Sequence, residues 1–275
     1  MSDACDQMIQ QILSAARRDP RIVGVVDYGS SSEGRADRWS DVDVALFVRD
    51  ADFELFERGW KLWAAQFGPL LLAYVGGVGH PWTVYDTPAI PLRVDFAFHR
   101  ASALDVMLTW PNAPTSAESM VLYDATGGQL TARAQQLVGQ SLQPRDLAQT
   151  FEQICGDFWY YVLRTWSKLQ RGQLWAARYD YHQIVLGLLI ALLRLEAGAT
   201  ERWRATSAVV AIEQALPPQR LAQLNGCIPD SDPASLARAF DAAAELGQTV
   251  CAAIATAQGW PWPERLAERA RALLR

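Results

Sequence analysis

The chain has 275 residues, of which half are apolar and a fifth are charged, as in an ordinary globular protein of one or two domains. Residues 1–150 hold 12 Lys or Arg and 18 Asp or Glu, whereas residues 151–275 hold 13 and 12. Enzymes that act on polynucleotides usually carry a basic stripe, so an acidic first half without one argues against a nucleic-acid partner. The charge is compatible with a small-molecule ligand, including a cationic one.

The sequence also bears on where the protein works. The longest apolar run, residues 184–193, is too short to span a membrane and is followed by Arg194, which is typical of a buried core helix. The N-terminal residues lack the basic and apolar segments of a signal peptide. The four cysteines are scattered, without the spacing of a zinc site or a disulfide framework. These observations predict a cytoplasmic protein without a membrane segment.

Helices and strands alternate in the first half. Apolar residues at helical spacing predict an amphipathic helix over residues 2–18, and the apolar run that ends at Val26 predicts a buried strand. A second strand is expected at residues 41–48 and a helix at residues 50–66. Four further strands are predicted at residues 70–75, 82–85, 91–98 and 121–124. This order indicates a mixed sheet with helices packed against it.

The second half has a helical pattern throughout. Helices are predicted at residues 146–171, 174–196, 206–216, 233–257 and 263–275. The first two are long and closely linked, so they should pack as an antiparallel hairpin. The predicted fold class is therefore α+β, with a small mixed-sheet α/β domain over residues 1–143 followed by an all-helical bundle domain over residues 144–275.

Gly29 and Ser30 follow the first strand in a turn that is predicted to open a short helix. Glycine has no Cβ, so the backbone can approach a ligand closely, and Ser30 offers a hydroxyl and an amide group. Helix N-termini bind anions through their unpaired N–H groups, which predicts that this turn holds phosphate. A Gly-Ser turn is common, and an ordinary helix cap is the alternative explanation.

Asp41 and Asp43 lie on the second strand with one residue between them. Because strand side chains alternate, the two carboxylates point to the same face, about 7 Å apart along the strand. Their repulsion is costly unless a cation lies between them, and Mg²⁺ prefers such oxygen ligands. Asp95, in a later apolar strand, supplies a third carboxylate. Each feature has an ordinary structural explanation alone, but their combination in this order favours an active site.

The series Gly29, Ser30, Asp41, Asp43 and Asp95 resembles the signature of the DNA polymerase β-like nucleotidyltransferase superfamily. Within it, the chain looks most like the antibiotic nucleotidyltransferases, the resistance enzymes that modify lincosamides and aminoglycosides. The resemblance makes residues 1–143 the nucleotidyltransferase catalytic domain. It implies that the three aspartates hold one or two Mg²⁺ ions, and that the turn, with Asp41 and Asp43, binds the nucleotide.

The reaction that the resemblance implies is the transfer of a nucleoside monophosphate to a hydroxyl group, with release of pyrophosphate. ATP is the expected co-substrate and AMP the transferred group, with other nucleoside triphosphates as alternatives. Asp95 is placed to accept the proton of the acceptor hydroxyl. Most of the rate would come from positioning and from charge neutralisation.

Three basic residues near the start of the helical half are predicted to bind the nucleotide. The resemblance implies that a helix after the catalytic domain faces the nucleotide, and Lys168, Arg171 and Arg178 lie in that segment. We expect one or more of them to contact the triphosphate. The alternative is that they are exposed helix charges in spaced ion pairs.

The acceptor is expected to be a small molecule. The helical half is nearly neutral and rich in aromatic residues, which favours a lincosamide over a heavily cationic aminoglycoside, since the latter would need several acidic residues there. A protein or nucleotide acceptor is a second interpretation. A third is a non-catalytic nucleotide-binding or toxin–antitoxin module. A homodimer is compatible with the sequence.

Overall fold

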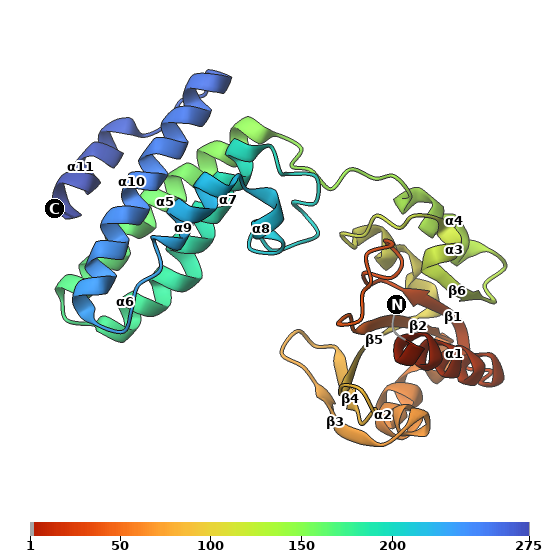
Figure 1. The fold of residues 1–275 in the computed structure, drawn as a ribbon. Coiled ribbons are helices and arrows are strands. Elements are labelled where there is room, and N and C mark those ends of the chain that lie inside the picture. Colours follow the sequence, from red (N-terminus) through yellow and green to blue (C-terminus); the bar gives the residue numbers. More distant parts are fainter. Residues whose placement is uncertain (1–2, 275) are drawn as a thin grey trace. The chain divides into compact units, whose positions relative to one another are not determined.

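The computed structural model describes residues 3–274 (Figure 1). The chain divides into two compact units, residues 1–141, here called the sheet unit, and residues 142–275, the helical unit. This arrangement of a mixed sheet followed by helices confirms the predicted α+β fold. The functional assignment of a catalytic domain to residues 1–143 and a second domain to residues 144–275 stays a prediction.

The sheet unit is built on six strands in the order β3-β4-β5-β2-β1-β6. The strands are β1 (Ile22–Asp27), β2 (Val42–Val48), β3 (Leu70–Val75), β4 (Pro81–Tyr85), β5 (Leu92–Arg100) and β6 (Val121–Asp124). β2 and β5 are parallel, whereas every other pair of neighbours is antiparallel, so the sheet is mixed. The predicted strands are all present.

Helical segments pack on both faces of this sheet, over part of its width on one of them. They are α1 (Asp3–Arg18), η1 (Asp50–Asp52), α2 (Phe53–Ala64), η2 (Ala65–Phe67), η3 (Ala101–Thr109), α3 (Ala117–Met120) and α4 (Gln129–Leu137). α1 and α2 pack on the face that carries Val44 and Val94. η3, α3 and α4 pack on the opposite face, over Ala45, Phe47 and Ala97. The alternation of side chains along β2 and β5 therefore builds two separate apolar layers.

The short helix predicted after Gly29 is wrong as a regular element. The segment forms one turn, in which the Gly34 N–H donates to Ser31 O at 3.0 Å and the Arg35 N–H donates to Ser30 O at 2.9 Å. Gly34 has φ +68, the left-handed conformation that ends a helix in a Schellman motif. A glycine so close to the start leaves no room for a second turn.

The helical unit packs around its longest helices. The helices of this unit are α5 (Leu147–Gln170), α6 (Leu174–Asp180), η4 (Tyr181–Val185), α7 (Leu186–Ala197), α8 (Ile212–Ala215), α9 (Pro218–Asn225), α10 (Pro233–Gln258) and α11 (Glu264–Leu274), of which α5 and α10 are the longest. α6, the π-helical turn η4 and α7 run on without a break, as the predicted helix at 174–196 requires. Phe158, Trp159 and Phe240 are fully buried in the shared core. None of the helices described over residues 3–274 is both long and apolar enough to cross a membrane.

Candidate active site

Asp43 and Asp95 are brought together by the pairing of β2 with β5. The two strands are parallel, and Asp43 lies directly opposite Asp95 in their register. Both residues come before the positions in their strands that η3, α3 and α4 cover. Asp41 immediately precedes β2 and lies on the same face as Asp43, since one residue separates them.

The three carboxylates form one cluster. One carboxylate oxygen from each of Asp41, Asp43 and Asp95 lies within 4.8 Å of the other two, and all three residues are partly buried. Arg93 donates to Asp41, with 2.9 Å between Nη2 and Oδ2. The structure thus gathers the three aspartates that the sequence singled out, and it adds a basic residue that the sequence did not flag.

The electrostatics of the cluster are unfavourable without a cation. Burial, followed by the charges of Asp41 and Asp95, raises the pKa of Asp43 to about 7. Burial and then the charge of Asp41 also raise the pKa of Asp95. Arg93 works in the opposite direction on both groups, but more weakly than burial does.

A magnesium ion fits these donors. Three carboxylate oxygens at close range form the hard, negatively charged ligand set that Mg²⁺ selects. A divalent cation would also offset the burial and the like charges that, in this order of size, raise the pKa of Asp43. Asp41, Asp43 and Asp95 would therefore hold it.

An Asp43→Asn variant should show, in EDTA, how much the charge of Asp43 destabilises the folded protein. In the unfolded chain Asp43 ionises near its ordinary pKa of 3.8, whereas in the folded chain it ionises near 7. The folded wild type therefore loses stability as the pH rises from about 4 to about 7, on the order of 3 kcal/mol in total. The variant should match the wild type near pH 4 and be clearly more stable at pH 8, as measured by urea unfolding. Equal stabilities at pH 8 would contradict the buried cluster.

The turn after β1 lies against Asp43. The Gly29 N–H donates to Asp27 Oδ1 at 2.9 Å, and Asp27 is almost fully buried. The Ser32 hydroxyl donates to Gly29 O at 2.8 Å. A Cβ on Gly29 would lie 2.2 Å from Asp43 Oδ2. Glycine is thus required at position 29 because the carboxylate of Asp43 occupies the space where a side chain would begin.

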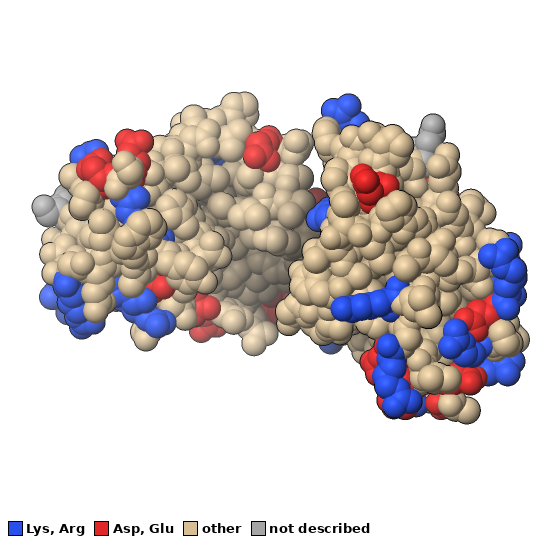
Figure 2. Space-filling model, turned by 90° about the horizontal axis from the view of Figure 1, so that it is seen from below, with Lys and Arg blue, Asp and Glu red and all other residues tan. Residues whose placement is uncertain are grey.

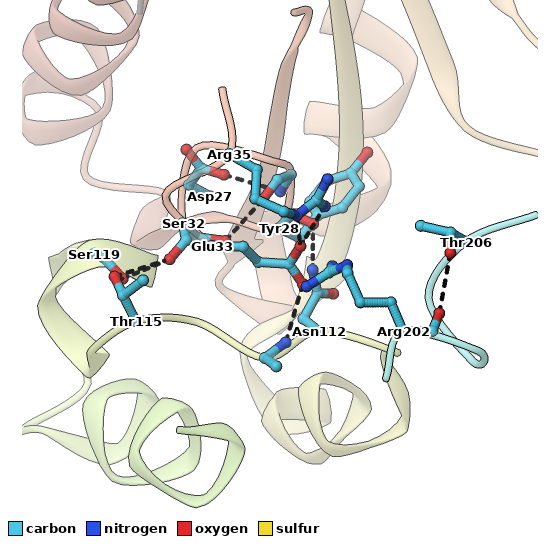
Figure 3. A network of polar contacts seen from close by, with 12 residues as sticks. Asp27, Tyr28, Ser32, Glu33, Arg35, Asn112, Thr115, Ser119, Arg202 and Thr206 are labelled. Carbon is cyan, nitrogen blue, oxygen red and sulfur yellow. Dashed lines mark hydrogen bonds and ion pairs between the residues drawn. The ribbon is translucent and has the colours of Figure 1, made fainter. Parts of the chain in front are cut away.

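The same turn is also held by hydrogen bonds from residues 112–119, far along the chain (Figure 3). The Asn112 side chain donates to Tyr28 O at 2.6 Å. The Thr115 N–H donates to Ser32 O at 3.0 Å, and the Ser119 hydroxyl donates to the same oxygen at 2.8 Å. The sequence predicted neither these contacts nor the helices around them, because nothing local to residues 112–119 indicates a partner near residue 30.

Ser30 keeps its predicted place in the turn. Its carbonyl accepts the Arg35 N–H, whereas its partly buried hydroxyl has no hydrogen-bond partner among the residues that the structure describes. The ordinary alternative, a hydroxyl that caps a helix, is therefore not what the structure shows. Nucleotide binding by Ser30 stays a prediction.

The basic residues of the helical unit have local contacts. Lys168 Nζ lies 2.5 Å from Asp180 Oδ2. Arg178 donates to the carbonyl oxygens of Ser231 and Asp232, which lie just before α10. Arg171, at the end of α5, is exposed. Contacts of Lys168, Arg171 and Arg178 with a triphosphate stay a prediction.

Two polar residues of the site escaped the sequence analysis. Arg93 is two residues from Asp95 on one strand, so the alternation that pairs Asp41 with Asp43 would have placed it on the same face. Tyr28 is partly buried, and desolvation together with the nearby aspartates raises the pKa of its phenol; the protonated hydroxyl donates to Asp95 O at 3.4 Å. No sequence pattern indicates that contact.

Comparisons with known proteins identify the family. No curated protein matches the chain. An aminoglycoside 6-adenyltransferase from Bacillus subtilis matches at 13% identity and a TM-score of 0.47, with 97% of this chain and 95% of that one covered. A nucleotidyltransferase-like protein from Exiguobacterium sibiricum matches at 15% identity and a TM-score of 0.40, with 97% and 87% covered. The family model for streptomycin adenylyltransferase matches residues 3–275. The chain therefore belongs to the streptomycin adenylyltransferase family.

Proposed function

We propose that this protein transfers AMP from ATP to a hydroxyl group of an aminoglycoside, with Mg²⁺ and with release of pyrophosphate. The observation that carries the proposal is the cluster of Asp41, Asp43 and Asp95 beside the Gly29 turn, in a chain of an adenylyltransferase family. Bound Mg²⁺ would neutralise the triphosphate and bring it close to the acceptor.

The residues of the chain have separate roles in this proposal. Asp41, Asp43 and Asp95 hold the cation, and the backbone of the Gly29 turn leaves room for the phosphates beside Asp43. The acceptor oxygen forms a bond to the α-phosphorus as the bond to the oxygen that bridges the α- and β-phosphates breaks. Asp95 takes the hydroxyl proton, since it lies opposite Asp43 and within the carboxylate cluster.

The family supports an aminoglycoside ahead of the lincosamide that the composition favoured, because its model is described by streptomycin. The face drawn in Figure 2 favours a small acceptor in either case. Figure 2 shows one face on which Lys and Arg side chains lie among Asp and Glu side chains and much neutral surface. A polynucleotide would need a continuous basic track instead.

The acceptor can be identified from the products of a mixed panel. Purified protein is incubated with ATP, Mg²⁺, several aminoglycosides including streptomycin, and a lincosamide, and the products are analysed by mass spectrometry. We expect an AMP adduct on at least one aminoglycoside, with an equal amount of pyrophosphate released. GTP, CTP and UTP in place of ATP test the choice of nucleotide.

The Asp41→Asn variant is the control for this experiment, since it should give no adduct with any acceptor. An adduct on the lincosamide alone would favour a lincosamide acceptor, as the composition predicted. If the wild type modifies no drug, the proposed antibiotic substrate is wrong, and the protein acceptor, the nucleotide acceptor and the non-catalytic module are the interpretations left.

A further inference from the structure

One half of the sheet has an uncovered face that adjoins the carboxylate cluster. Along β4, Pro81, Thr83 and Tyr85 are buried, whereas Trp82 and Val84 between them are partly exposed. The buried set faces α2, because Tyr85 belongs to the apolar layer of that helix. The exposed set therefore points to the opposite face.

Strand pairing shows which residues share that face. Asp43 lies opposite Asp95, Asp95 opposite Trp82, and Trp82 opposite Tyr74. Residues directly opposite each other in a sheet point to the same side. Asp43, Asp95, Trp82 and Tyr74 thus form one row across four strands, which begins at the cluster and ends at the edge strand β3.

Within the described residues of the sheet unit, no helix packs over the end of this row. η3, α3 and α4 lie over Ala45, Phe47 and Ala97, further along β2 and β5. Tyr74 remains 40% exposed. Within the sheet unit, an aromatic surface therefore continues directly from the three clustered carboxylates.

The two rings are held in fixed positions. Tyr74 and Trp82 meet edge to face, with their centroids 5.8 Å apart at an interplanar angle of 83°. The Trp82 ring also lies against Gly76, where a Cβ would come within 2.5 Å of its atoms. A ring fixed in this way loses little entropy when a ligand binds to it.

The row lies on the side of the cluster that an acceptor would approach. The Gly29 turn follows β1, which neighbours β2 on the side away from β5. With the triphosphate at that turn, pyrophosphate leaves on the β1 side, and in-line attack brings the hydroxyl from the β5 and β4 side. Asp95, the proposed proton acceptor, lies between the two sides.

We propose that Trp82 and Tyr74, here called the aromatic floor, bind one ring of the acceptor and hold its hydroxyl beside Asp95. This inference rests on the proposed function. An aminoglycoside ring suits the floor, because aromatic faces attract ammonium groups and pack against apolar C–H surface. β3 and β4, which carry the floor, contain no Lys or Arg, and Arg93, which lies on the same face, is paired with Asp41.

The test compares Trp82→Ala with Trp82→Phe in the full-length protein. The kinetic constants for the aminoglycoside are measured at saturating MgATP, and the Kd of MgATP is measured by calorimetry. Trp82→Ala should raise the KM of the acceptor roughly tenfold, the size of one well-formed cation–π contact, and should leave the Kd of MgATP unchanged. Trp82→Phe should recover most of the loss, and Tyr74→Ala should show a smaller effect in the same direction.

Leu62→Ala is the matched control, since Leu62 is an exposed apolar residue on α2, the helix that packs on the other face of the sheet. It should change none of these constants. The aromatic floor would be overturned if Trp82→Ala kept the acceptor KM of the wild type, or if it lost MgATP affinity to the same extent as acceptor affinity. In either case, AMP transfer by the wild type would leave the proposed function intact. Absence of transfer by the wild type to any aminoglycoside would instead overturn the proposed function, and the floor with it.

Discussion

Replacing Asp43 by asparagine is expected to abolish AMP transfer, with a loss in kcat of at least about 10³-fold. Asp43 lies at the centre of the carboxylate cluster, opposite Asp95 and two residues from Asp41. Asparagine keeps the shape of the side chain but removes the negative charge that holds the cation. Pyrophosphate release at saturating ATP, Mg²⁺ and acceptor measures the effect.

The design of this experiment separates catalysis from folding. Asp6→Asn removes the same charge from an exposed position on α1 and should leave turnover unchanged. Asp43→Asn should at the same time be more stable than the wild type in EDTA at pH 8, because burial and like charge oppose ionisation of Asp43. Loss of activity with gain of stability is typical of a functional residue. Turnover close to that of the wild type would refute the three-carboxylate site.

The carboxylate cluster could be predicted because its signal is local. Asp41 and Asp43 share a face by strand periodicity alone, and Asp95 lies on a strand with a clear apolar pattern. The sequence could not give the register that puts Asp43 opposite Asp95, because some fifty residues separate them. The position of Trp82 in the row depends on the pairing of β5 with β4 in addition to that of β2 with β5. The sequence therefore did not distinguish Trp82 from the other tryptophans.

The helix predicted at residues 206–216 failed for a physical reason in the helical unit. Only Ile212–Ala215 is helical there. Buried Arg194 donates to the carbonyl oxygens of Ala208 and Val210, which a helix would have paired with its own N–H groups. Helical spacing of apolar residues does not reveal a side chain that arrives from α7. The long helices α5 and α10, whose carbonyl groups have local partners, were predicted to within two residues.

Replacing Gly29 by alanine should also cost activity, by about 10²-fold in kcat, through displacement of Asp43. Gly29 is not among the residues with positive φ, so the backbone there accepts alanine without strain. The new methyl group, however, would lie 2.2 Å from Asp43 Oδ2 and 2.9 Å from Asp43 Cγ, far inside contact distance. The carboxylate must therefore move, and a shift of about 1 Å is enough to disturb a reacting geometry.

Gly59→Ala is the matched control, because Gly59 lies in α2 and a Cβ there would meet nothing within 4 Å. That variant should retain full activity and gain roughly 0.5–1 kcal/mol of stability from helix propensity. Since the harm in Gly29→Ala arises from contact with Asp43, the two changes should not be additive: introduced into Asp43→Asn, Gly29→Ala should cause little further loss of the residual rate. Wild-type kcat in Gly29→Ala, or a full further loss in the double variant, would show that the turn and the carboxylate act independently.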